Sequence, residues 1–246
     1  MKNYTLKTLP PIVQKLLGVD TNSKTVKGRK RGFMTGIVYL APSDESGAIN
    51  TCPNASAGCR EACLFSAGRG AMDNVRQPRI QKTLSWANNP DGWLLKLASE
   101  INSLMTSAAR KGLTPCVRLN GTSDIPWEKD PVNGANNIME LFPNVQFYDY
   151  TKSPQRVIEN KIKNYHLTFS RSESNAHHVK RVMAKSDANI AIVFRGKLPN
   201  RYQGRKVING DDSDLRFLDP KKCIVGLVDK GKAKKDSTGF VIEVAS

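Results

Sequence analysis

The feature that most constrains the fold of this chain is a regular alternation of short apolar runs with segments of helical character. The helical segments include 91–112, in which Trp93, Leu97, Ile101 and Leu104 recur at three- and four-residue intervals. Such alternation predicts βαβ units around a parallel sheet. We therefore expect an α/β fold, with a TIM-like (β/α) barrel, incomplete or irregular, ranked ahead of an open doubly wound sheet. The expected strands lie in residues 32–42, 115–124, 145–153, 165–175, 189–196 and 222–231.

The chain of 246 residues predicts a single domain, 1–246. Within it we expect an N-terminal helical and basic arm at 1–32 and a barrel-like catalytic domain at 33–246. No apolar run reaches the roughly 18 residues that span a bilayer, and the N-terminus lacks the features of a signal peptide. A cytoplasmic protein without a membrane partner is the expectation.

The charge of the chain is strongly positive, with a formal net charge of +16. Release of counterions makes a surplus of this size a driver of binding to a polyanion, so a nucleic acid is the predicted partner. The positive charge would also suit binding to a membrane surface or to an acidic protein. Two local basic runs, at 25–32 and 229–236, are the candidates to hold phosphates.

The stretch TCPNASAGCREACLFSAGRG, residues 51–70, places Cys52, Cys59 and Cys63 within twelve residues. Five cysteines is an odd number, and the chain shows no secretory signal, so disulfides are not expected. The cluster therefore predicts a metal site, with three unliganded thiols as the plain alternative.

Two kinds of metal site fit three cysteines. Zinc would need a fourth ligand, for which His178 or its neighbour His177 is the candidate. An iron–sulfur cluster could leave its fourth position open to a ligand. Cys116 and Cys223 lie at the starts of expected strands, on the opposite rim, and are predicted to be core residues.

Polar side chains follow several of the expected strands, at the edge where parallel α/β folds collect their active sites. A further segment, 207–220, is rich in aspartate and predicts an active-site loop or an acidic turn. It lacks the closing Glu of a calcium loop. The candidate site residues at or after the strand ends are Asn120, Ser123, Asp124, Asp149, Ser170, Arg171, Asn175 and Arg195, and Asp212 is added from the acidic segment.

The motifs VRLNGTSD, FYDYTKSP, HLTFSRSESN and GDDSDLRFLDP, together with the cysteine stretch, resemble a family of phage and plasmid proteins. That family is similar to DNA-guanine transglycosylases, distant relatives of the tRNA-guanine transglycosylases. The resemblance implies a glycosyltransferase of the host cytoplasm that acts on double-stranded DNA. It would replace guanine by a 7-deazaguanine base such as preQ0, through a covalent intermediate between an aspartate and deoxyribose.

The resemblance also implies roles for individual residues. A transglycosylase of this kind uses two aspartates, a nucleophile and a proton shuttle. Asp124 is the first choice, and Asp149 is ranked ahead of Asp212 as the second. The predicted substrate-binding residues are Asn120, Ser123, Ser170, Arg171, Asn175 and Arg195.

Two other interpretations stay open. Transglycosylases bind zinc through three cysteines and a histidine nearer the C-terminus, whereas the cluster here follows the first long strand. A radical-type iron–sulfur enzyme carries its cluster at that place in a partial barrel, although Cys-x6-Cys-x3-Cys departs from its usual spacing. A non-catalytic, zinc-stabilised DNA-binding protein is the third interpretation.

Overall fold

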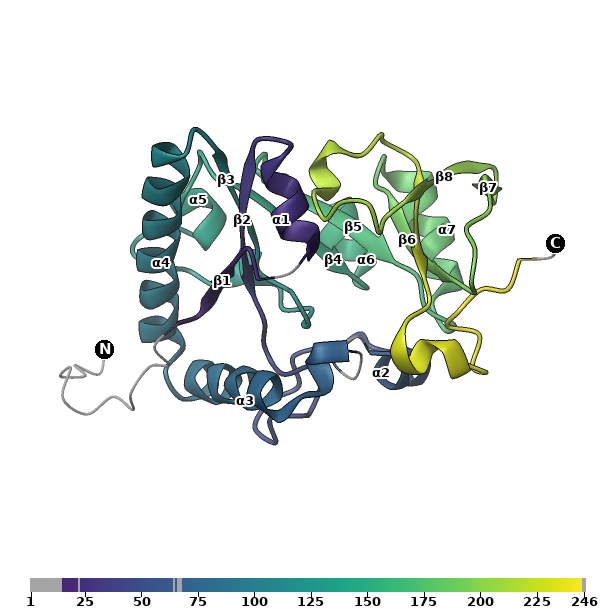
Figure 1. The fold of residues 1–246 in the computed structure, drawn as a ribbon, viewed down its shortest axis with the longest axis horizontal. Coiled ribbons are helices and arrows are strands. Elements are labelled where there is room, and N and C mark those ends of the chain that lie inside the picture. Colours follow the sequence, from purple (N-terminus) through teal and green to yellow (C-terminus); the bar gives the residue numbers. More distant parts are fainter. Residues whose placement is uncertain (1–14, 22, 64, 66–67, 245–246) are drawn as a thin grey trace.

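A computed structural model describes residues 15–21, 23–63, 65 and 68–244, and its centre is one nine-stranded sheet (Figure 1). The strand order is β1-β2-β3-β4-β5-β6-β9-β8-β7. All pairs from β2 to β8 in this order are parallel, which confirms the α/β class. These strands are β2 (Phe33–Val38), β3 (Thr114–Arg118), β4 (Gln146–Thr151), β5 (Tyr165–Ser170), β6 (Ile190–Phe194), β9 (Ile224–Val228) and β8 (Arg205–Asn209).

Two short antiparallel strands flank the parallel ones. β1 (Leu17–Val19) pairs with β2, and β7 (Arg201–Tyr202) pairs with β8. Over the residues that the structure describes, no ladder joins β1 to β7, so closure into a barrel is not shown. From β2 to β6 the strands follow each other in chain order, without the reversal that marks a doubly wound sheet.

The basic part of the expected N-terminal arm is not an extended arm. Residues 25–29 belong to helix α1 (Ser23–Arg29), which packs beside β2 (Figure 1). The turn after α1 ends at Gly32, whose φ of 84° suits a residue without a side chain. The expected helical start falls largely on residues 1–14, outside the described residues.

One face of the sheet is covered by helices that share the main core with it. The indoles of Trp93 and Trp127 stack there with ring centroids 5.3 Å apart, and Trp127 begins the short helix η4 (Trp127–Lys129). Among the described helices, none is long and apolar enough to cross a bilayer. The helices on this face are α4 (Pro90–Arg110), α5 (Ile138–Leu141), α6 (Pro154–Ile158) and α7 (Ala176–Lys185), and α3 (Asp73–Asn88) leads into α4 after η3 (Gly68–Ala71).

The other face is covered by α1 and by the short helix η5 (Arg216–Leu218). Leu215 and Phe217 pack there against Tyr148 of β4. Because side chains alternate along a strand, Phe147 and Asp149 point to the opposite, helix-covered face, and Phe147 lies in the main core. The direction in which Asp149 points matters for the site.

Candidate metal centre at the carboxyl edge of the sheet

The loop after β2 carries the three cysteines and is fixed by hydrogen bonds to its own backbone and to the next strand's loop. Thr51 donates its hydroxyl to the carbonyl of Ala41 and accepts, through its own carbonyl, the backbone N–H of Asp124 at 2.8 Å. Helix α2 (Ala57–Glu61) follows, with Ser56 as its N-cap. The loop therefore holds Cys52, Cys59 and Cys63 at the carboxyl edge, next to the loop after β3.

The three thiols lie close enough to influence one another. Burial, with smaller contributions from Cys59 and Cys52, raises the pKa of the Cys63 thiol to about 11. Burial also raises the pKa of Cys52, again with a contribution from Cys59. All five cysteines are described, and none forms a disulfide. Among the described residues, no three His, Cys, Asp or Glu side chains are arranged around a single metal position.

The predicted histidine ligand lies on a helix after β5. His178 belongs to α7, with its ring centroid 3.9 Å from that of His177. Its pKa is lowered by burial first and then by His177 and Arg181, all on the same helix. The ring contact of His178 in the structure is therefore with its neighbour on the same helix.

Glu173, in the loop after β5, holds the cysteine helix in place. Its carboxylate accepts the Ser56 hydroxyl at 2.7 Å and the backbone N–H of Gly58 at 2.9 Å. A Cβ at Gly58 would overlap the Thr238 hydroxyl and lie 3.0 Å from the Glu173 carboxylate. Position 58 must be glycine because α2 is clamped between the β5 loop and the C-terminal segment.

This clamp gives a first prediction. Glu173→Gln keeps the shape of the side chain but loses one of two charge-assisted hydrogen bonds, which costs about 1–2 kcal/mol of local stability. We expect Cys59 to react about 10-fold faster with a thiol reagent in this variant. Glu61→Gln, an exposed change on the same helix, is the control, and equal rates in the two variants would contradict the role given to Glu173.

A lysine faces the thiols from the end of β4. Lys152 donates from Nζ to Ser170 Oγ at 3.0 Å and lies 5.8 Å from the ring centroid of Phe240. Its charge lowers the pKa of Cys63, against the larger effect of burial. Ser170 was a predicted site residue, and the structure places it in this group.

The predicted catalytic aspartates lie together, but on the helix-covered side. Asp149 is fully buried and accepts the backbone N–H of Asn120 at 2.7 Å, its side-chain amide at 3.1 Å and the Tyr165 hydroxyl at 2.8 Å. Burial raises the pKa of Asp149 to about 6, although these donors lower it. Asp124 accepts Arg156 at 2.6 Å and the backbone N–H of Lys152 at 2.9 Å. Both carboxylates are thus engaged in internal hydrogen bonds.

The acids of the segment 207–220 are distributed over separate contacts. Asp212 accepts the side-chain amide of Asn209 at 2.8 Å. Asp211 pairs with Lys24 and Lys230, and Asp214 accepts Arg118 and the Tyr148 hydroxyl. In the part of the chain that is described, no hydrogen bond joins Asp212 to Asp124 or Asp149. The acids of this segment are therefore held in separate turns and ion pairs.

The remaining predicted substrate-binding residues mostly hold the protein together. Ser123 donates to Asn120, and Asn175 binds the backbone of its own loop. Arg171 donates to the carbonyls of Gly239 and Phe240. Arg195 pairs with Glu243 and donates to the carbonyls of Lys234 and Asp236. The two arginines therefore fasten the C-terminal segment over the carboxyl edge.

Cys116 and Cys223 are buried, as predicted, with Cys116 Sγ 3.2 Å from the Thr35 hydroxyl.

Sequence reasoning did not select Glu173 or Arg156 as anchors of the site. The position of Glu173 after a strand was visible, but its partners in α2 lie 115 and 117 residues away in the chain. No local pattern signals such a contact.

The face opposite the main helices carries a titratable group. Burial, with a smaller contribution from Arg216, lowers the pKa of His166 to about 4. The unfolded chain takes up this proton near pH 6.5, so the folded state loses stability as the pH falls from about 6.5 towards 4. His166→Gln removes this loss. Between pH 7 and 4.5, we expect the free energy of unfolding of the wild type to fall by about 2 kcal/mol more than that of the variant.

Urea titrations at several pH values measure this difference. The raised pKa of Asp149 also makes stability depend on pH, because its protonation favours the folded state below about pH 6. Asp149 is present in both proteins, so this contribution cancels in the comparison. Parallel stability curves for wild type and His166→Gln would contradict the prediction.

Fold and site define the class: a mixed α/β protein whose parallel sheet carries a three-cysteine loop after its first parallel strand. Over residues 14–244 the chain matches the family described as Gene product 88, and it belongs to that family. Comparisons with curated proteins and with solved structures give no match.

Proposed function

We propose that this protein is a radical-type iron–sulfur enzyme whose cluster is held by Cys52, Cys59 and Cys63. The observation that carries the proposal is the place of these thiols. They gather in the loop after β2, the first parallel strand of a consecutively ordered sheet. With three protein ligands, a cluster would keep its fourth position for a ligand.

A cluster needs no fourth protein ligand, whereas a structural zinc ion takes four. The loop after β2 supplies three thiols, and Cys52, Cys59 and Cys63 lie close enough to perturb one another's pKa values. When bound, a cluster would supply one-electron redox chemistry beside these thiols.

The residues around the thiols have supporting tasks. Glu173 fixes α2 and with it Cys59. Lys152 places a positive charge beside Cys63, which favours the thiolate form needed for ligation. We further propose that the sheet curves as a partial, TIM-like barrel, whose carboxyl edge forms the mouth of the site. The thiols favour the reducing cytoplasm.

Base exchange on DNA stays a prediction with weaker support. It needs a carboxylate that reaches a sugar carbon, whereas Asp149 is fully buried on the helix-covered face. Asp124 is 9% exposed and is bound by Arg156. Either group would have to leave its partners before it could attack.

Anaerobic purification with elemental analysis tests the proposal. We expect a brown protein that contains iron and sulfide, absorbs near 400 nm and gives an electron paramagnetic resonance signal after reduction. Zinc without iron would overturn the proposal. In parallel, incorporation of labelled guanine or preQ0 into duplex DNA is measured for the wild type and Asp124→Asn. Incorporation that is lost in this variant would establish base exchange in place of the radical function.

A further inference from the structure

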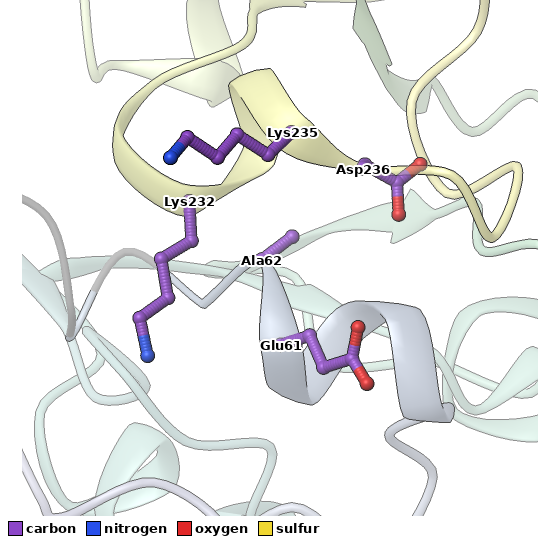
Figure 2. A pocket seen from close by; sticks show the side chains of 5 residues that line it. All are labelled: Glu61, Ala62, Lys232, Lys235 and Asp236. Atoms are coloured by element: carbon purple, nitrogen blue, oxygen red, sulfur yellow. The ribbon is translucent and has the colours of Figure 1, made fainter.

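The C-terminal segment forms a basic turn directly against the cysteine helix. Helix η6 (Gly231–Lys235) follows β9, and its Ala233 packs with Ala62, Phe240 and Val241 in one small cluster that also touches Cys59. Between η6 and α2 lies a pocket of about 450 Å³ (Figure 2). Its lining residues are Glu61, Ala62, Lys232, Lys235 and Asp236.

The charges of three lysines on this turn are not neutralised by acidic side chains of the described residues. Lys232, Lys234 and Lys235 are exposed and, over the described residues, form no ion pair. Lys230 differs from them because it shares Asp211 with Lys24. Three cations thus stand on one exposed turn beside the site.

The two acidic residues that line the pocket differ in their contacts and exposure. The Asp236 carboxylate accepts the hydroxyl of Thr238 at 2.7 Å and the backbone N–H of Val241 at 2.9 Å. Burial raises the pKa of Asp236, but these bonds outweigh that effect and lower it, so Asp236 shapes the turn. Glu61 is exposed at the end of α2 and marks one wall of the pocket (Figure 2).

We propose that the surface formed by Lys232, Lys234 and Lys235, with the adjoining pocket, binds the phosphodiester backbone of a nucleic acid. Resting on the proposed function, this surface would deliver the substrate to the cysteine site. Lysine ammonium groups on flexible stems suit phosphates as point charges and carry no base preference. Binding would be driven by release of counterions, in keeping with the net charge of +16.

A membrane surface fits this turn less well. Proteins that lie on bilayers insert apolar side chains beside their basic ones. The exposed large hydrophobic residues among those described are Val26, Met72, Leu95 and Leu218, and none lies on η6. The turn offers charge without apolar side chains, which matches a phosphate backbone.

Fluorescence anisotropy with labelled 20-nucleotide single-stranded DNA, duplex DNA and RNA, over a series of salt concentrations, tests the proposal. The test variant is the triple change Lys232→Gln, Lys234→Gln and Lys235→Gln. A charge-matched control changes Lys161, Lys163 and Lys185 to Gln; these are exposed and lie before β5 and β6, at the amino edge. Wild type, test variant and control are compared on all three nucleic acids.

For the test variant we expect binding 10- to 100-fold weaker at low salt. The slope of log K against log salt should fall by up to about 2.7 on duplex DNA or about 2.1 on a single strand. The control should stay within about threefold of the wild type. The three nucleic acids show which backbone is preferred. Equal losses in test variant and control would overturn the proposal, because charge spread over the whole surface would then explain binding.

Further measurements distinguish this proposal from binding to anionic lipid or to an acidic polypeptide, and they also distinguish it from the proposed function. Vesicles with anionic lipid and poly-glutamate are titrated in the same way. If either depends on the three lysines more strongly than nucleic acid does, the inference is wrong. A Cys52, Cys59 and Cys63 to Ser variant should keep the wild-type slope. That result supports the lysine surface whether or not the protein carries iron, whereas the iron analysis alone decides the function.

Discussion

Replacement of Cys52, Cys59 or Cys63 by serine, one at a time, is expected to lower the iron content of the anaerobically purified protein by at least fivefold. A hydroxyl is a poor ligand for iron compared with a thiolate. Each replacement would leave the cluster with only two thiolate ligands. The absorbance near 400 nm should fall in parallel with iron and sulfide.

The other two cysteines provide matched controls. Cys116 and Cys223 are buried in small clusters away from the thiol loop. Cys116→Ala and Cys223→Ala should keep the wild-type ratio of iron to folded protein, even though each leaves a small cavity. If the loss of iron were the same for all five cysteines, the site would not be the loop after β2.

Arg156→Met is expected to produce the largest loss of stability among the ion-paired residues considered. The Arg156 side chain is 6% exposed and donates to Asp124 at 2.6 Å, Glu128 at 2.7 Å and the Tyr165 hydroxyl at 2.8 Å. Methionine fills a similar volume but leaves the buried Asp124 and the partly buried Glu128 without their counter-charge. We expect the free energy of unfolding to fall by about 3–5 kcal/mol.

Denaturant titration at pH 7 measures this effect, with Arg76→Met as the control. Arg76 also pairs with a carboxylate, Glu45 at 2.7 Å, but both side chains are more than a third exposed. Such a pair contributes about 0–1 kcal/mol. Similar losses in the two variants would show that the network around Asp124 does not depend on its buried charge.

Much of the fold could be predicted because its signals are local. The apolar spacing of 91–112 predicts a helix, and the structure has α4 at Pro90–Arg110. Each expected strand overlaps one of the observed parallel strands, since a short apolar run between turns is the pattern of a covered sheet. Cysteine spacing likewise identified the loop of the candidate site.

Other elements depended on distant partners. β1 is a strand because Leu17–Val19 pairs with β2, although the sequence there predicts part of a helical and basic arm. The hairpin of β7 and β8 turns at Gln203 and Gly204, both with positive φ, inside a stretch that reads as irregular. The hairpin also depends on β9, with which β8 pairs in parallel.

By itself, the sequence determined the α/β class, the approximate positions of the main parallel strands, and the grouping of Cys52, Cys59 and Cys63 in one loop. Only the tertiary structure decided which face Asp149 occupies and which residues anchor the thiol loop. A strand covered on both faces is apolar on both, so FYDYT does not tell which side meets the helices. The clamp from Glu173 joins residues more than a hundred positions apart, and only folding brings them together.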